Sequence, residues 1–195
     1  MATGFGARLV GRLGGGEPRI REYYVPSTDT TALLVGDFVT EDGVGALDPN
    51  SEVPVITRAA TTDPLVGVII GFKPDASLPY TGQYRAGSTN RYVLVCDDQD
   101  AVYEMQEDAV GGTIAKVDIG YEKNVAIVVA SGSTVTGLSG SMIDSSTITT
   151  SASDLKIVGV RRDPSNPALV GVSSGAGAIL LVKINTTALN TNDNT

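Results

Sequence analysis

Short runs rich in Val, Ile and Thr recur along this chain from residue 33 onward, and Gly, Pro, Asp or Asn separates them about every 8–12 residues. No segment carries a sustained helical period of apolar residues. This spacing is typical of an all-β domain. Runs such as residues 125–130 are apolar on both faces and must be covered twice. The sequence therefore predicts an antiparallel β-barrel or β-sandwich body with an extended N-terminal arm.

The predicted strands are residues 33–40, 53–58, 66–72, 91–96, 101–106, 113–118, 125–130, 147–150, 155–160, 169–172 and 178–184. The clearest alternation lies in residues 101–106, which places Ala101, Tyr103 and Met105 on one face, as expected of a half-buried strand. We expect this strand to pair with residues 91–96. The four residues between them include three aspartates, which suit a hairpin loop.

Residues 1–24 differ from the rest of the chain. They hold six glycines and four arginines against two glutamates, whereas the whole chain has a net charge of −8. A basic arm joined to an acidic body suggests an interaction segment. Because a Gly-rich segment is costly to order alone, we expect it to become ordered on a partner. The alternative is a disordered terminus without a role.

Two segments of the chain are mostly polar, one between predicted strands and one after the last of them. Residues 131–154 are rich in Ser, Thr and Gly and predict a long, solvated excursion with one weak strand, although their hydroxyls could also bond a neighbouring copy. Residues 185–195 are polar and predict a frayed tail. The predicted organisation is an arm at 1–24, a β-rich body at 25–184 and a tail at 185–195.

Composition excludes several classes of function. The chain of 195 residues has no His and one Cys, which removes the commonest general base, the commonest metal ligand and an internal disulfide. The acidic balance argues against nucleic-acid binding, because that affinity rests on cations that neutralise phosphates. No apolar run approaches the roughly 20 residues that span a bilayer. The first residues lack a signal-peptide pattern, so we expect synthesis in the cytoplasm, and no membrane partner.

Three candidate nucleophiles resemble catalytic motifs incompletely. Residues 171–175 match the nucleophile elbow of hydrolases, but no His is present to accept the proton. Ser153 and Lys156 form a Ser-x-x-Lys match, yet a separation of three on a strand places them on opposite faces. Cys96 precedes Asp97 and Asp98, whose charges disfavour a thiolate, and we interpret it as a small buried hydrophobe. We predict that the chain is not an enzyme.

Six carboxylates gather between residues 97 and 108 and raise the question of a cation or glycosidase site. The segment lacks the Gly turn and the distal Glu of a Ca²⁺ loop. Paired carboxylates serve glycoside hydrolysis, but with no Trp and 5% aromatic residues the usual sugar-stacking platforms are scarce. We expect a solvated acidic hairpin, with a bound cation as the alternative, and we predict no cofactor.

Two stretches carry a resemblance to a known group of proteins. Residues 84–108, which read YRAGSTNRYVLVCDDQDAVYEMQED, and the later run 155–164 with the closing strand that ends at residue 185, resemble head decoration (cement) proteins of tailed bacteriophages. They cover under half of the chain. The resemblance implies a β-rich, noncatalytic virion protein that clamps adjoining major capsid protein subunits on the outside of the shell. Weak contacts made by many copies would together stabilise the shell strongly.

Our hypothesis is that the arm lies across a capsid subunit or a neighbouring copy. Arg8, Arg12, Arg19 and Arg21 would meet capsid carboxylates, and Tyr23 with Tyr24 would act as anchors where the arm enters the body. Deletion of residues 1–22 is then expected to abolish shell binding and leave the body folded. We also expect a homo-oligomer, a dimer or a trimer. The alternative function is a minor tail, fibre or host-attachment module that binds a glycan or a receptor.

Overall fold

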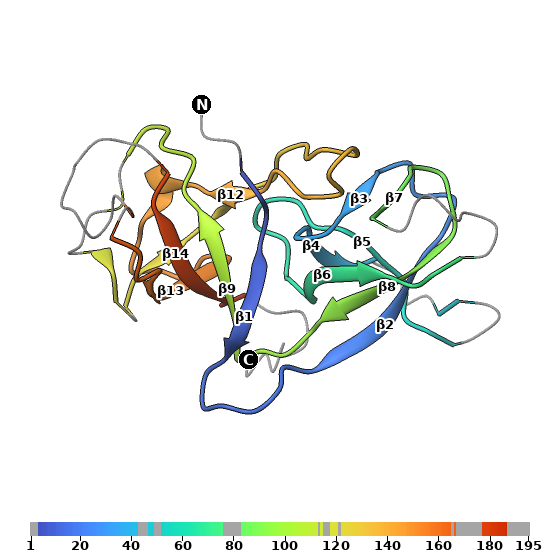
Figure 1. The fold of residues 1–195 in the computed structure, drawn as a ribbon, viewed down its shortest axis with the longest axis horizontal. Helices are drawn as coiled ribbons and strands as arrows, with labels where there is room; N and C mark the ends of the chain where they lie inside the picture. The colour runs from blue at the N-terminus through green and yellow to red at the C-terminus, as the bar shows by residue number, and fades with distance from the viewer. Residues whose placement is uncertain are drawn as a thin grey trace.

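Antiparallel strands form nearly all of the regular structure in the computed structural model, which describes residues 4–42, 47–48, 52–75, 83–112, 114, 118–120, 122–164, 166 and 177–186. Two five-stranded sheets lie next to each other along the long axis of the molecule (Figure 1). Within the described residues, the sheets do not close into a barrel. The all-β prediction is confirmed, and the arrangement is sandwich-like.

The first sheet has the strand order β1-β9-β14-β13-β10 and the second has the order β2-β8-β6-β4-β5. Two short pairs, β11-β12 and β3-β7, accompany them. The bounds are β1 Arg8–Arg12, β2 Ile20–Val25, β3 Leu33–Leu34, β4 Phe38–Glu41, β5 Ile56–Arg58, β6 Gly67–Phe72, β7 Tyr84–Arg85, β8 Arg91–Cys96, β9 Ala101–Gln106, β10 Asn124–Val125, β11 Ile127–Val128, β12 Met142–Ile143, β13 Leu155–Val160 and β14 Ile179–Ile184, with a 3-10 turn, η2, at Ser145–Thr147.

The larger core joins the two sheets. Phe38 and Val68 from the second sheet belong to the same buried cluster as Tyr103, Leu180 and Ile157 from the first. The rings of Phe38 and Tyr103 meet edge to face with centroids 6.5 Å apart. Because the cluster draws on both sheets, the burial of apolar side chains holds them together.

A smaller core lies within the second sheet, which curls on itself. Tyr23, Val39, Ile56, Ile69 and Val93 are buried there, one from each of its strands. An isolated parallel bridge between residues 24 and 55 brings the β5 side of the sheet back to β2. The curl gives this sheet its own interior besides the face that it shares with the first sheet.

The predicted hairpin between residues 91–96 and 101–106 is wrong. Both strands form at the predicted residues, but β8 pairs with β2 and β6, whereas β9 pairs with β1 and β14. The intervening aspartates do form a turn, since Asp98 Oδ1 accepts the amide hydrogen of Asp100 at 2.9 Å. That turn carries the chain from one sheet to the other (Figure 1). Alternation identifies a half-buried strand, but it does not name its partner.

Other strand predictions have mixed outcomes. Residues 155–160 form β13 as predicted, and residues 178–184 contain β14. Residues 33–40 divide into β3 and β4 at a turn around Gly36, whose φ of 92° favours glycine. Residues 125–130 contain only the short β11 and the end of β10. Residues 169–172 and most of 113–118 lie outside the described residues.

The predicted strand at 147–150 is wrong. The side chain of Asp144 accepts the backbone amide of Ser146 at 2.9 Å and its hydroxyl at 2.6 Å, which starts η2 at the residue that follows Asp144. A short Asp or Ser side chain that bonds nearby backbone competes with a strand ladder. Only an isolated bridge between Asn124 and Thr149 remains of the expected strand.

The expectation of a solvated excursion at 131–154 is wrong for three of its serines. Ser139, Ser141 and Ser145 are buried. The hydroxyl of Ser139 donates to the buried carboxylate of Asp37 at 2.5 Å, and that of Ser145 donates to Asp108 at 2.9 Å. The polar residues of this segment therefore fasten it to the body, because buried polar groups need partners.

The N-terminal segment is also part of the body. Residues 8–12 form β1, at one edge of the first sheet, and residues 20–25 form β2, at one edge of the second. The expectation that residues 1–24 become ordered only on a partner is wrong for residues 4–24. The six glycines of this segment suggested that it has no structure of its own, but three of them, Gly14, Gly15 and Gly16, lie in the turn between the two strands. No helix in the described part of the chain is long and apolar enough to cross a bilayer.

Candidate protein-interaction site

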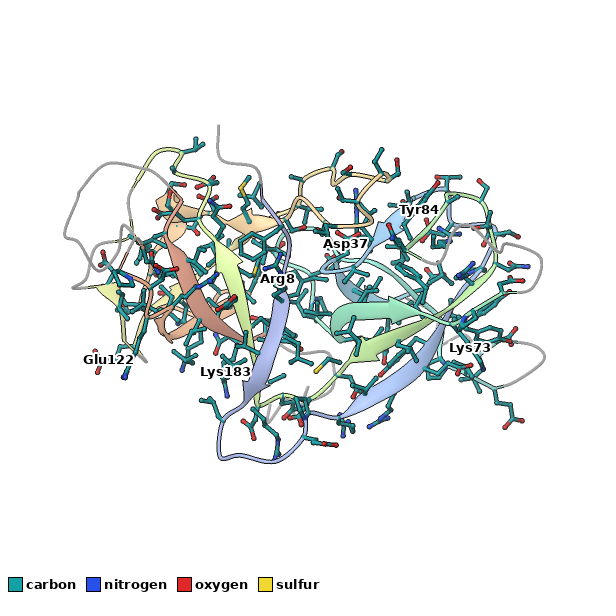
Figure 2. All side chains as sticks on the ribbon, viewed as in Figure 1. Arg8, Asp37, Lys73, Tyr84, Glu122 and Lys183 are labelled. Atoms are coloured by element: carbon teal, nitrogen blue, oxygen red, sulfur yellow. The ribbon has the colours of Figure 1, made fainter. Side chains whose placement is uncertain are left out.

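The predicted contact residues do not all lie together. Arg8 projects from β1, and its guanidinium carbon lies 4.6 Å from the centre of the Phe5 ring (Figure 2). Such an exposed cation–π contact is worth about 0.5–1 kcal/mol. Arg12 lies at the other end of β1, where its Nε is 2.9 Å from Asp98 Oδ2 and its Nη2 is 3.6 Å from Asp100 Oδ2.

Asp97 gathers three of the predicted residues around one buried carboxylate. Its side chain has no exposed area. Arg19 Nε donates to Oδ1 at 2.7 Å, Arg21 Nε lies 3.1 Å from Oδ2, and the Tyr23 hydroxyl donates to Oδ2 at 2.8 Å. We call Asp97, Arg19, Arg21 and Tyr23 the Asp97 cluster. It ties β2 to the turn that links the sheets.

Two members of the Asp97 cluster, Tyr23 and Arg19, have shifted pKa values. Burial, and then the hydrogen bond to Asp97, raise the pKa of the Tyr23 phenol far above its ordinary value of 10.0. The hydrogen bond to Asp97 raises the pKa of the Arg19 guanidinium further. The Tyr23 phenol thus stays neutral and acts as a hydrogen-bond donor to Asp97.

A surface hollow of about 610 Å³ lies over this region. Its lining carries both signs of charge: Arg12, Glu17, Arg19, Arg21, Asp98, Gln99 and Asp100. The guanidiniums are bonded on one side to carboxylates of the 97–100 turn and remain partly exposed on the other. A guanidinium has five N–H donors in a fixed fork, so such a group can hold one carboxylate and offer donors to another.

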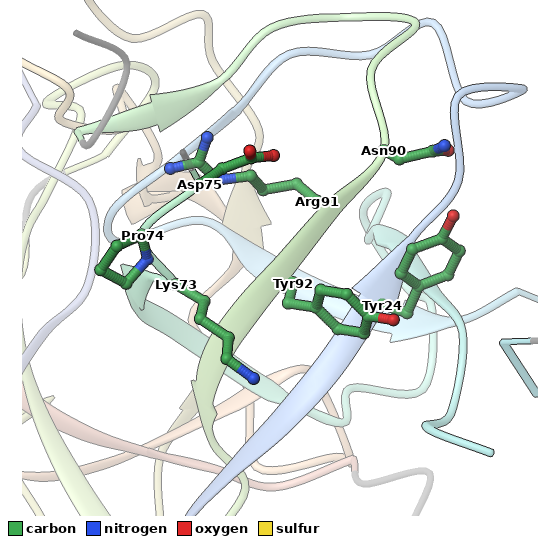
Figure 3. A pocket seen from close by; sticks show the side chains of 7 residues that line it. All are labelled: Tyr24, Lys73, Pro74, Asp75, Asn90, Arg91 and Tyr92. Carbon is green, nitrogen blue, oxygen red and sulfur yellow. The ribbon is translucent and has the colours of Figure 1, made fainter. Parts of the chain in front are cut away.

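Tyr24 and Arg8 lie outside the Asp97 cluster. Tyr24 pairs across the strands with Tyr92, with ring centroids 5.1 Å apart. Burial raises the pKa of the Tyr24 phenol, and the charge of Asp48 adds to the effect. The pair borders a separate pocket (Figure 3). Tyr23 is a buried structural residue, whereas Tyr24 is half-buried at the surface.

The residues considered for chemistry have other partners. Cys96 is buried, as predicted, and burial raises the pKa of its thiol. Glu107 accepts the amide hydrogens of Ile114 and Ala178 at 3.0 and 3.1 Å, and Glu104 lies 3.7 Å from Arg161. The described residues contain no group of three or more side chains placed to hold a metal ion. Residues 171–175 lie outside them.

Sequence reasoning missed the residues that border the pocket beside Tyr24. Lys73, Asp75, Asn90, Arg91 and Tyr92 come from two separate stretches of the chain. Lys73 and Asp75 come close to residues 90–92 because β6 pairs with β8, and Tyr24 meets Tyr92 because β2 pairs with the other side of β8. The sequence feature that could have pointed to this pocket is a tyrosine at position 24 and another at position 92, although their strands are known to be neighbours only from the structure. Comparison with models of protein families, with curated proteins and with solved structures gives no match for this chain.

Proposed function

We propose that this chain is a noncatalytic structural virion protein that binds the outside of a phage capsid and cements adjacent major capsid protein subunits. The resemblance of residues 84–108 and of the run beginning at residue 155 to head decoration proteins supports the proposal. So does the arrangement of the arginines on β1 and β2. The capsid surface is proposed to bind along these two strands and the turn between them.

The observation that carries the proposal is a set of arginines that are fixed in position and still partly open to solvent. The side chains of Arg12, Arg19 and Arg21 retain 37%, 48% and 52% of their exposure while each is bonded to an aspartate. Anchoring one side lowers the entropy lost when the other side binds a capsid carboxylate. Repetition over many copies would turn modest contacts into strong attachment.

Two exposed apolar residues lie among these arginines. Val10 on β1 is 49% exposed and Ile20 at the start of β2 is 47% exposed. Apolar side chains with a polar rim of arginines are typical of protein interfaces. The pairing register shifts between Leu9 and Gly11, so Val10 lies at an irregularity of an outermost strand. Bulges and charged side chains at the edge of a sheet hinder pairing with strands of unrelated chains. Such an edge is compatible with a surface that binds one specific partner.

The test uses the full chain with capsids of its encoding phage prepared without it. The Arg8→Gln/Arg12→Gln variant removes two charges from β1. The matched control, Lys156→Gln/Arg162→Gln, removes two charges from β13 and the residues after it. We expect co-sedimentation with capsids to weaken at least about tenfold for the β1 variant, equal to about 1.4 kcal/mol per site. Equal binding by both variants contradicts the proposed surface, and no binding by the native chain contradicts the function.

The proposal includes self-association as a dimer or a trimer, since decoration of a symmetric shell favours clusters at its symmetry axes. Light scattering of the free protein and of protein released from capsids measures the assembly. A monomer in both preparations contradicts this part of the proposal. The location in the virion, at the capsid exterior, is tested by gentle dissociation of particles, in which the protein is expected to separate with heads rather than tails.

A further inference from the structure

The pocket beside Tyr24 has about 350 Å³ of volume, near the small end of the roughly 300–1,000 Å³ range of ligand sites. It opens on the second sheet, at the end of β2 away from the Asp97 cluster. Figure 3 shows the side chains around it. The ones used below are Tyr24, Lys73, Asp75, Asn90, Arg91 and Tyr92.

Two tyrosines form one wall of the pocket. Tyr24 on β2 and Tyr92 on β8 are direct cross-strand partners, with rings inclined at 51°. The Tyr92 hydroxyl donates to Asp48 Oδ2 at 2.6 Å, which fixes that ring. The chain has only seven tyrosines and no Trp, so two of its few aromatic rings border one small pocket. Aromatic rings offer an apolar face together with a polar edge.

Polar groups border the rest of the pocket. Asn90 Oδ1 accepts the amide hydrogen of Ser27 at 2.6 Å, which orients its side-chain amide. Arg91 also borders the pocket, but it is only 3% exposed and is therefore part of the buried base of the site. Asp75 and Arg91 lie at the same end in Figure 3. Asp75 gives this end of the pocket a carboxylate acceptor.

The charges at the pocket balance. Lys73 Nζ lies 3.0 Å from both carboxylate oxygens of Glu22 and 5.3 Å from the centre of the Tyr92 ring. Arg91 and Asp75, which carry opposite charges, both line the pocket. A phosphate or a carboxylate would meet these acidic groups as well as the cations. Balanced charge therefore favours a neutral ligand with many hydroxyl groups.

We propose that this pocket binds a neutral hexopyranose unit of a surface glycan. The C–H face of the sugar packs on Tyr24 and Tyr92, and neighbouring hydroxyls bond to Asn90 and Asp75. Hydrogen bonds to charged groups are stronger than neutral ones, which suits discrimination between sugar epimers. The inference goes beyond capsid attachment, because it gives a second binding site on the opposite end of β2.

The experiment titrates the isotope-labelled full chain with methyl glycosides of glucose, galactose, mannose and N-acetylglucosamine, and follows backbone amide shifts. We expect at least one glycoside to shift the resonances of residues 24 and 90–92 with a dissociation constant on the order of 1 mM. Inorganic phosphate is the charged comparison. No shift with any glycoside, or stronger binding of phosphate, overturns the proposal.

Variants separate binding from folding. Tyr24→Ala is expected to weaken glycoside binding at least tenfold, whereas Tyr24→Phe keeps the ring and restores it. Asn90→Ala alters an exposed side chain and is expected to weaken binding with only a small fall in the midpoint of thermal unfolding, because its bond to the Ser27 amide is lost as well. Tyr84→Ala on β7 is the matched control. Unchanged binding in both Tyr24→Ala and Asn90→Ala overturns the assignment. Retained glycoside binding by Arg8→Gln/Arg12→Gln would show that this site is independent of capsid attachment.

Discussion

Asp97 shows how one residue connects distant parts of the chain. It is a fully buried carboxylate, and such a charge is tolerated only when it is paired and hydrogen-bonded. Its partners Arg19, Arg21 and Tyr23 lie on or next to β2, more than 70 positions away in the sequence. Arg19 and Arg21 thus stabilise the fold as well as border the proposed capsid surface, whereas Arg8 and Arg12 on β1 lie outside the Asp97 cluster.

The two arginine partners of Asp97 are expected to matter more for stability than other surface arginines. Among the described residues, Arg19→Ala/Arg21→Ala leaves the buried carboxylate of Asp97 with the Tyr23 hydroxyl as its side-chain partner, so we expect a loss of about 3 kcal/mol in the free energy of unfolding. Arg8→Ala is expected to change it by less than about 1 kcal/mol, because only its contact with Phe5 is lost. Urea denaturation measures both, and equal effects would contradict the role of the Asp97 cluster.

Asp98 is expected to make stability depend on pH. Burial raises the pKa of its carboxyl, but the amide hydrogens of Asp100 and Arg19, with the guanidinium of Arg12, lower it by more, to below the ordinary value of 3.8. Because the folded-state pKa is the lower one, Asp98 stabilises the fold above pH 3.8, and that contribution disappears as the pH falls through the folded-state value.

The measurement compares urea unfolding of the native chain and Asp98→Asn between neutral and strongly acidic pH. We expect the difference in unfolding free energy to be largest above pH 3.8 and to shrink below it. A difference that stays constant through the acidic range contradicts this assignment of Asp98.

At the scale of the element, β6 depends on a close approach to β8. A Cβ atom added at Gly67 would lie 2.2 Å from the carbonyl oxygen of Cys96, whereas one at Gly71 would meet only Leu94 Cδ1 at 3.9 Å. The two glycines occupy the same strand and provide a matched pair. One is required by the neighbouring backbone, and the other is not.

Gly67→Ala is expected to cost about 1–3 kcal/mol, because the backbone of β8 must move to admit the methyl group. Gly71→Ala is expected to be neutral or to stabilise by up to about 1 kcal/mol, since alanine restricts the unfolded chain. The midpoints of urea unfolding compare the two variants. Similar losses at both positions would show that the distance between β6 and β8 is not the cause.

Residues 8–12 and 20–25 form β1 and β2 of the two sheets, so a chain that lacks residues 1–22 is no longer expected to keep its fold. Deletion of residues 1–22 removes β1 and the first half of β2, together with Arg19 and Arg21, the arginine partners of Asp97. We expect the truncated chain to lose cooperative thermal unfolding, followed by circular dichroism. A cooperative transition like that of the full chain would instead restore the description of this segment as a separable arm.

At the scale of the whole molecule, a net charge of −8 coexists with a local group of arginines on β1 and β2. Long-range repulsion and local attraction respond differently to salt, because screening at physiological ionic strength acts beyond about 8–10 Å. Attachment that depends on partly exposed arginines is therefore expected to weaken as salt increases.

Co-sedimentation with capsids across a series of NaCl concentrations measures this effect. We expect steadily less bound protein at higher salt for the native chain and a shallower dependence for Arg8→Gln/Arg12→Gln. Binding that does not change with salt would show that apolar contacts, rather than the arginines, dominate attachment.

The sequence by itself determined the all-β class and the positions of β8, β9 and β13, because alternation and turn residues are local properties of a strand. It also identified Cys96 as buried and the aspartates of 97–100 as a turn. Only the tertiary structure decided which strands pair, that residues 8–12 and 20–25 belong to the two sheets, and that Tyr24 meets Tyr92. Pairing depends on contacts between residues far apart in the chain, and local patterns of hydrophobicity do not encode which partner buries a given face.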